Sequence, residues 1–281
     1  MQFKDKVALI TGASRGIGRA LAAGLAREGC DVVVAAKTVT DDPDLPGTIH
    51  ATAKEVEALG RQAMPFQVDL RDPDRVVEMV EATVDRFGRV DFLINNAGAI
   101  YLRDVEQTST KRYDLVHSVN SRAPFIAARE CIPHMKRQGF GQILNMSPPL
   151  DPALAPGKVA YSISKLGMTL LTLGLSEELR GSGVAVNSLW PETMVESQAV
   201  IKWKMGTRQM WRTPQIVVDA ALGIFAQDSK VFTGHTLLDE TFLSEHCGVE
   251  DFTIYRCEPD VEPPKVGLDW KLKLGKVDPQ G

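Results

Sequence analysis

The chain has 281 residues, of which 44% are hydrophobic and 24% are charged, and its formal net charge is −4. These values are ordinary for a globular protein with a sizeable core, and the acidic balance argues against a nucleic-acid binder, which usually carries a basic face. No apolar run approaches the roughly 20 residues that a membrane span needs. The N-terminus leads directly into a predicted strand, so we expect no cleavable signal. We therefore expect a cytoplasmic protein, with import into an organelle left open.

Four cysteines are scattered without a framework spacing: Cys30, Cys131, Cys247 and Cys257. His246 lies beside Cys247, but no CxxC or HxxxH pair supports a metal site. We predict no bound metal and reduced, mostly structural thiols.

Seven short apolar runs predict strands buried on both faces of a parallel sheet, because they are rich in Val, Ile and Leu without polar alternation. Longer stretches with helical periodicity separate them. Six repeats of strand and helix predict a single α/β domain, a doubly wound, mostly parallel seven-stranded sheet of the Rossmann type with helices on both faces. The predicted strands are residues 7–10, 31–36, 63–68, 91–96, 141–146, 184–189 and 235–239.

Two segments interrupt this alternation. Residues 38–50 form a polar, proline-bearing insertion after the second strand, and residues 259–281 form a tail whose VGLDWKLKL patch is typical of an edge strand. A loosely ordered tail, or one that docks on another subunit, is an equal alternative. We expect the main domain to span residues 1–258.

The first predicted strand runs into a glycine loop, TGASRGIG at residues 11–18, and then into an alanine-rich helix. Glycines at these positions let the backbone turn tightly and approach a pyrophosphate, and the following helix offers N–H donors and a partial positive charge to the anion. The loop therefore predicts a dinucleotide site built from Gly12, Ser14, Arg15, Gly16, Ile17 and Gly18.

Tyr161 and Lys165 are four residues apart, so on a helix they share one face. A phenol with a pKa near ~10 is a poor base at neutral pH. A neighbouring ammonium favours the phenolate and lowers that pKa toward the working range. The pair is therefore a candidate acid/base catalyst with its activator.

The glycine loop, NNAG at 95–98, Asn120 and YSISK at 161–165 together resemble the short-chain dehydrogenase/reductase family over roughly residues 5–245. A closer likeness is to its hydroxysteroid dehydrogenase-like branch, some of whose members add a sterol-carrier-like domain, which we do not expect in this chain. That likeness rests on AAKT at 35–38, GTIH at 47–50, CIPHMK at 131–136, NMSPPL at 145–150 and NSLWP at 187–191.

This resemblance implies a nicotinamide cofactor and assigns further residues to it. Asp69 is where the family holds the adenine amino group. Asn96, Ala97 and Gly98 belong to the stretch that backs the adenine ring, whereas Asn95 is equally well explained as a structural bridge between strands. Pro191 and Thr193, with Ser197 nearby, lie where the family holds the carboxamide.

The charge at the end of the second strand favours NADP(H) over NAD(H). An acidic side chain there would bind both ribose hydroxyls and repel a 2′-phosphate. The position that is acidic in NAD-preferring relatives is Ala36, and Lys37 follows it. Arg15 faces the same end of the ribose in family members, so two cations and no carboxylate favour the 2′-phosphate.

For catalysis, the resemblance implies that Tyr161 donates a proton to the substrate oxygen and that Lys165 activates it and binds the nicotinamide ribose. Asn120 would hold a water that links Lys165 to solvent. Most family members also have two serines at the end of the fifth strand, and the second polarises the substrate oxygen.

Here proline occupies the position of that second serine, since the chain reads Asn145-Met146-Ser147-Pro148. Proline has neither a hydroxyl nor an N–H group. Ser147 is the candidate donor if the kink turns it inward. Losing one preorganised oxyanion donor costs on the order of 10²–10³ in rate, so the pattern permits either a rewired enzyme or a weak one.

A second departure follows the sixth strand, where the family's Pro-Gly is Pro191-Glu192. Replacing a left-handed glycine with glutamate predicts an altered turn above the nicotinamide. The next segment, residues 192–213, lies where the family places its substrate lid. Its apolar face favours a lipid-like carbonyl compound, and its basic face an anionic head. An amphipathic helix that simply packs on the protein is an even alternative. The apolar residues are Met194, Val200, Ile201, Trp203, Met205, Met210 and Trp211, and the basic ones are Lys202, Lys204, Arg208 and Arg212.

The sequence favours an NADP(H)-dependent oxidoreductase that interconverts a carbonyl and an alcohol on an apolar lipid-, steroid- or acyl-like substrate. The alternative is a dinucleotide-binding protein with little catalysis that acts as a redox-responsive partner or scaffold, which Pro148 favours. An enoyl reductase is disfavoured, because its tyrosine and lysine lie further apart. The family's habit of pairing through the helices that carry Asn120 and Tyr161 implies a homodimer or homotetramer.

Overall fold

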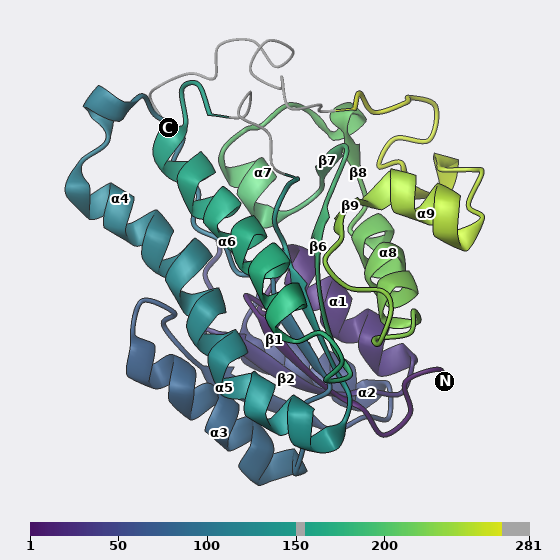
Figure 1. Ribbon diagram of the computed structural model, residues 1–281. Helices are drawn as coiled ribbons and strands as arrows, with labels where there is room; N and C mark the ends of the chain where they lie inside the picture. The colour runs from purple at the N-terminus through teal and green to yellow at the C-terminus, as the bar shows by residue number, and fades with distance from the viewer. Residues whose placement is uncertain (150–154, 266–281) are drawn as a thin grey trace.

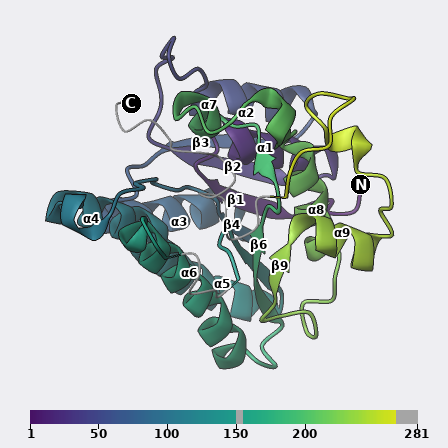
Figure 2. The same ribbon diagram turned by 90° about the horizontal axis from the view of Figure 1, so that it is seen from above.

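The computed structural model describes residues 1–149 and 155–265. Its seven-stranded parallel sheet has the order β3-β2-β1-β4-β5-β6-β9 and lies between two layers of helices (Figure 1, Figure 2). All seven predicted strands are confirmed, and each end lies within one residue of its prediction. Their bounds are β1 Val7–Thr11, β2 Asp31–Ala36, β3 Ala63–Gln67, β4 Phe92–Asn95, β5 Gly141–Asn145, β6 Val184–Trp190 and β9 Thr236–Leu238.

The helices divide between the two faces of the sheet, and Figure 2 shows the two layers on opposite sides. Along β1, Ala8 and Ile10 pack into one apolar core and Leu9 packs into the other. This is the burial on both faces that the uninterrupted apolar runs predict. The first layer contains α1 (Gly16–Arg27), α2 (Ile49–Ala58), α8 (Gln215–Phe225) and α9 (Asp239–Cys247), and the second contains α3 (Pro73–Phe87), α5 (Ala123–Gln138) and α6 (Val159–Glu178).

The strand order reverses between β1 and β4, and doubly wound folds bind ligands in the crevice at the carboxyl ends of the strands there. Polar side chains stabilise the sheet beside this point. Asn95 Nδ2 donates to Asn145 Oδ1 at 2.8 Å, and Asn145 Nδ2 donates to Thr172 Oγ1 at 2.8 Å. All three residues are buried, so Asn95 serves as the structural bridge that was one of its two interpretations.

Helix α6 has an unexpected property. Within the described part of the chain, it is the one helix whose length and composition would suit a membrane crossing. The sequence alone led us to expect no apolar segment of that length. However, α6 packs against β6, β5 and α5, and its Met168, Thr169 and Thr172 are buried. This packing explains the apolar residues on the buried side of the helix.

The chain between β6 and α8 forms a small substructure at the carboxyl end of the sheet. It contains β7 (Met194–Val195), α7 (Gln198–Lys202), a 3-10 turn (Arg208–Met210) and β8 (Trp211–Arg212), and β7 pairs with β8. A further 3-10 turn (Thr253–Tyr255) leads into residues 256–265.

Residues 256–265 pair with this substructure through two isolated antiparallel β-bridges. One joins Arg256 to Arg212, and the other joins Lys265 to Thr193. Packing contacts therefore continue to Lys265, past the predicted domain end at residue 258. The VGLDWKLKL patch lies outside the described residues.

Candidate active site

The glycine loop packs against the NNAG segment at the point where the strand order reverses. Gly12 has a φ of +68°, and a Cβ added there would lie 2.8 Å from the Cα of Ala97. A Cβ at Gly18 would lie 2.4 Å from the carbonyl oxygen of Gly12. Asn96 Nδ2 donates to the Thr11 carbonyl at 2.9 Å. Only glycine fits these contacts. Without side chains at these positions, the backbone is accessible where a pyrophosphate would approach α1, so these residues fit a dinucleotide.

The insertion after β2 packs on this loop. Arg15 Nη2 donates to the Gly47 carbonyl at 2.9 Å, while the Arg15 Nε is buried without a hydrogen-bond partner among the described residues. The N–H of Ala13 donates to the Ala35 carbonyl at 3.2 Å, which holds the end of β2 against the loop. Lys37 follows β2 and is exposed. The two predicted cations therefore lie on adjoining segments, and the insertion fixes one of them.

Asp69, predicted to bind the adenine amino group, is already paired with Arg71. Arg71 Nε donates to both carboxylate oxygens of Asp69, at 2.9 and 3.0 Å. This pairing lowers the pKa of Asp69 to about 2. The carboxylate is partly exposed, so an adenine amino group would have to share it with Arg71.

Four sequence motifs meet at the Lys165 ammonium. Its Nζ donates to the Met146 carbonyl at the end of β5, at 2.7 Å. A Cβ added at Gly98 would lie 3.7 Å from both Lys165 Nζ and Asn120 Oδ1. Tyr161 lies one turn earlier on α6. The NNAG segment, Asn120, the end of β5 and the YSISK helix are thus brought into one site.

Asn120 lies in a π-helical turn, Ser118–Arg122, between α4 (Thr110–His117) and α5. Such turns interrupt the regular helical hydrogen bonding and are frequent at functional sites. Its side chain holds Ala99 from both sides, accepting from the N–H at 2.8 Å and donating to the carbonyl at 2.9 Å. Asn120 Nδ2 also donates to Ser164 Oγ at 3.0 Å, and Ser164 donates to the Tyr161 carbonyl at 2.7 Å. Through Ser164, Asn120 therefore holds the helix that carries Tyr161 in position.

Ser147 is fully buried, and its Oγ has no hydrogen-bond partner within the described part of the chain. A buried hydroxyl without a partner is uncommon and indicates a group that binds water or a ligand. Next to it, the Pro148 carbonyl accepts from Thr169 Oγ1 of α6 at 2.6 Å. Pro148 lacks the hydroxyl of the family's second serine. However, the hydrogen bond to its carbonyl holds the loop against α6 and keeps Ser147 buried.

Burial shifts the pKa of both members of the Tyr161–Lys165 pair. It raises the pKa of the Tyr161 phenol above its ordinary value and lowers the pKa of the Lys165 ammonium to about 8. Both shifts favour the neutral forms, because a buried charge loses its hydration. In this state Tyr161 is an acid that holds its proton, and a positive charge brought beside it would favour the phenolate.

The side chain and backbone of Glu192 attach the turn after β6 to another element. Glu192 does not adopt a left-handed backbone. Its N–H donates to Asp239 Oδ1 at 2.8 Å, and its Oε1 accepts from the N–H and Oγ1 of Thr241 at 2.8 and 2.5 Å. The turn is thereby attached to the first turn of α9. Beside it, Thr193 is buried and its Oγ1 has no partner in the described residues.

The predicted basic face of the lid is partly wrong. Arg212 is 1% exposed and pairs with Glu240 and Glu262. Much of the apolar face is also turned inward, since Val200 and Trp211 pack with Cys257 and the lid's three methionines. Ile201 and Trp203 remain exposed, at 46% and 44%. The carboxylates that bury Arg212 are distant in sequence, so residue type alone did not reveal them.

Within residues 1–149 and 155–265, no group of three His, Cys, Asp or Glu side chains is arranged to hold a metal ion. The four cysteines are free thiols, of which only Cys247 is exposed.

Comparison with known proteins gives the family. A sequence model of short chain dehydrogenases matches residues 6–205. The chain belongs to the short-chain dehydrogenase family. The match includes the glycine loop, Asn120 and the Tyr161–Lys165 pair, so this short-chain dehydrogenase carries the family's oxidoreductase architecture and its NAD(P) fold.

Similar proteins agree with this assignment. Hydroxysteroid dehydrogenase-like protein 2 of Xenopus tropicalis is 44% identical over 89% of this chain and 60% of the relative. The Homo sapiens protein of the same name is 43% identical over the same shares. The chain thus spans about 60% of the length of these two relatives.

Solved structures extend the likeness. A short chain dehydrogenase from Mycobacterium thermoresistibile is 40% identical, with a TM-score of 0.87 over 99% of this chain and 98% of that one. A metagenomic short-chain oxidoreductase in complex with NADP is 27% identical, with a TM-score of 0.71 over 85% and 98%.

Sequence reasoning missed several residues that shape the site of this dehydrogenase. Ser164, Thr169 and Arg71 bind Tyr161, Pro148 and Asp69 respectively. Ser164 had a detectable signal, since it lies three residues after Tyr161, where side chain and backbone meet on a helix. Thr169 and Arg71 had none that single-residue chemistry reveals.

The pKa of Lys165 predicts an unusual pH dependence of stability. Between pH 8 and its ordinary pKa near ~10.4, the unfolded chain holds a proton that the folded protein has released, so stability rises with pH. Relative to Lys165→Met, the cofactor-free protein should gain about 1–2 kcal/mol of unfolding free energy between pH 7.5 and 9.5. Urea unfolding at the two pH values measures this. Lys202→Met, at an exposed lysine, is the control and should show no such difference. A constant gap between protein and Lys165→Met would contradict a lowered pKa.

Proposed function

We propose that this short-chain dehydrogenase uses NADP(H) to interconvert a carbonyl and an alcohol on an apolar, lipid-, steroid- or acyl-like substrate. The observation that carries the proposal is the meeting of Tyr161, Lys165, Asn120 and the unpartnered Ser147 hydroxyl at the carboxyl end of β5. When bound, the cofactor supplies the hydride.

In the reductive direction, Tyr161 donates its proton to the substrate oxygen. The Lys165 ammonium stabilises the phenolate that remains and orients the nicotinamide ribose. Ser147 donates a hydrogen bond to the same substrate oxygen, in place of the family's serine at Pro148. Asn120 holds Ala99 and Ser164 in place, and a water at its turn returns the proton to Lys165.

The cofactor is assigned to the residues along the reversal point. Gly12, Ser14, Gly16, Ile17 and Gly18 bind the pyrophosphate, Asn96 to Gly98 back the adenine, and Asp69 binds its amino group beside Arg71. Pro191 and Thr193 bind the carboxamide, for which the unpartnered Thr193 hydroxyl is suited. Arg15 and Lys37 bind the 2′-phosphate. The Gly47 contact occupies one of five guanidinium N–H donors on Arg15, which leaves others for the phosphate.

The substrate class rests on Ile201 and Trp203, the two apolar side chains of the lid that stay exposed. They give α7 an apolar tip suited to an acyl or steroid body. A binding protein with little catalysis remains the second candidate, since Pro148 removes one hydroxyl and burial keeps Tyr161 protonated.

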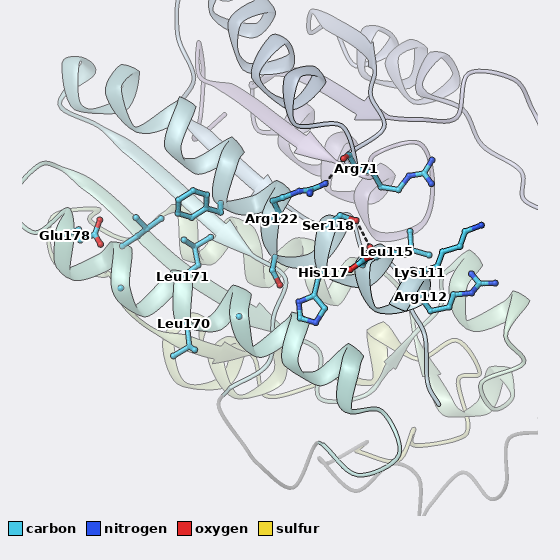
Figure 3. Close-up of a pocket in the computed structure, with 16 residues that line it drawn as sticks. Arg71, Lys111, Arg112, Leu115, His117, Ser118, Arg122, Leu170, Leu171 and Glu178 are labelled. Atoms are coloured by element: carbon cyan, nitrogen blue, oxygen red, sulfur yellow. Dashed lines mark hydrogen bonds between the residues drawn. The ribbon is translucent and has the colours of Figure 1, made fainter. Parts of the chain in front are cut away.

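A second copy of the chain is the expected partner. A groove of about 1100 Å³ runs along α4, α5 and α6 (Figure 3). Phe125 and Leu170 in it are 51% and 58% exposed. Figure 3 shows Glu178 at one end of the groove and Lys111 and Arg112 at the other. A two-fold axis across the groove would bring each acidic end to the partner's basic end and cover the apolar middle.

The catalytic roles are tested by NADPH oxidation with aldehydes, ketones and 3-oxoacyl compounds. Tyr161→Phe should abolish turnover, and Ser147→Ala should lower it on the order of 10²–10³, the cost of one oxyanion donor. Tyr113→Phe, at an exposed tyrosine of α4, is the control and should keep full activity. Unchanged turnover in Tyr161→Phe would refute the mechanism. Saturable NADPH binding without turnover on any compound would favour the binding-protein alternative.

Cofactor choice is tested by Lys37→Asp, which should repel a 2′-phosphate and accept the ribose hydroxyls. We expect the ratio of kcat/KM for NADPH to that for NADH to fall roughly 10- to 100-fold, since each tenfold change is about 1.4 kcal/mol and a charged hydrogen bond contributes about 1.5–3 kcal/mol. Lys230→Asp, far along the chain and exposed, should leave the ratio unchanged. No change in Lys37→Asp would show that the charge argument is wrong.

The dimer is tested by Leu170→Glu, which places a charge in the apolar middle of the groove. Light scattering after gel filtration should show a multimer for the unaltered protein and a monomer, or a weakened multimer, for Leu170→Glu. Val231→Glu, at an apolar residue that is 74% exposed elsewhere, should leave the mass unchanged. A monomeric unaltered protein would disprove the proposal.

A further inference from the structure

Six charged side chains form an unbroken chain of ion pairs between the lid and the C-terminal segment, which we call the C-terminal clasp. Their signs alternate, so each inner member touches two opposite charges. The order is Arg256–Glu262–Arg212–Glu240–Lys265–Glu192, and the four pairs from Glu262 to Glu192 are 2.6, 2.7, 3.1 and 2.8 Å long. Arg256 Nε joins Glu262 at 2.8 Å.

The central pair of the clasp is buried, and the residue on either side of that pair is exposed. Side-chain exposure is 1% at Arg212 and 6% at Glu240, against 56% at Glu262 and 60% at Lys265. Water screens the outer pairs, so their contribution is modest. The inner pair needs both partners, because a buried charge without its partner is strongly destabilising. The outer members can therefore be changed without unfolding the protein.

At one end, the clasp holds the turn that follows β6. Lys265 binds this turn twice, through its Nζ to Glu192 and through its backbone in an antiparallel bridge to Thr193. Glu192 is further tied to α9 by Asp239 and Thr241. The buried hydroxyl of Thr193 has no partner in the described residues. The position of Thr193 is thus fixed by residues that lie more than forty positions later in the chain.

The same C-terminal segment also holds the other end of the lid, where the chain leads into α8. The backbone of Arg256 forms an isolated antiparallel β-bridge with that of Arg212. The N–H of Cys257 donates to the Trp211 carbonyl at 3.2 Å, and the N–H of Thr213 donates to the Tyr255 carbonyl at 2.7 Å. Both ends of the lid, Thr193 and Arg212, are therefore fixed by one short stretch of chain.

We propose that residues 256–265 are a working part of the cofactor site, in which Glu192, Glu240 and Lys265 are positioning residues for Thr193 at the nicotinamide end. The proposal rests on the proposed function. It gives a reason for the exchange of glycine at 192, since glycine has no carboxylate and offers Lys265 no attachment. The clasp acts on the nicotinamide end alone, because the adenosine end is held by the glycine loop and by the segments after β2 and β3.

The test compares two ligands that differ at that end, NADPH and adenosine 2′,5′-bisphosphate, which lacks the nicotinamide. In Lys265→Ala the Kd for NADPH should rise roughly fivefold, the size expected for an exposed pair, while the Kd for the bisphosphate stays the same. Glu192→Gly, which restores the family's residue, should behave alike. Lys265→Arg should recover the binding of NADPH, because it keeps the charge.

The control is Arg180→Ala, which removes an exposed ion pair with Glu177 at the end of α6 and should change neither Kd. Equal losses for both ligands in Lys265→Ala, or no loss for NADPH, would overturn the positioning role and leave the proposed function intact. Failure of the unaltered protein to bind either ligand would overturn the proposed function itself, and this inference with it.

Discussion

The hydrogen bond from the Lys165 ammonium to the Met146 carbonyl joins the helix that carries the tyrosine to the carboxyl end of a central strand. Once that bond is made, the ammonium lies beside Gly98, which Asn120 also approaches, and the ring of Trp190 is 5.5 Å away. The cost is the burial of a cation, which lowers its pKa to about 8. Catalytic sites commonly hold groups in such unfavourable states, because the chemistry requires an amine or phenol that changes charge easily.

The two departures from the family pattern have a shared consequence. Pro148 lacks a hydroxyl, but its carbonyl accepts from Thr169 and keeps the end of β5 against α6. Glu192 replaces a glycine, and its carboxylate attaches the turn after β6 to α9 and Lys265. Both loops border the place where a nicotinamide would lie. Conformational freedom is thus removed on two sides of the candidate site, by a proline and by a set of ion pairs.

How far the sequence predicts the protein differs between the strands of the sheet and the lid. The strands were predicted to within one residue because each is a short apolar run whose neighbours are polar, and that contrast is local. The glycine loop was assigned for the same reason. The lid was predicted less well. Arg212 was expected at the surface, yet it is buried by Glu240 and Glu262, which lie 28 and 50 residues further along.

The sequence by itself determined the doubly wound fold, the dinucleotide loop and the family, because these depend on residue type at fixed local spacings. It also indicated that position 148 was unusual and that the turn at 192 was altered. Only the tertiary structure decided that Ser147 is buried without a partner, that Arg71 holds Asp69, and that Lys265 reaches Glu192. Such contacts depend on where distant segments are brought together in space, and an ion pair between residues 73 positions apart leaves no local pattern in the chain.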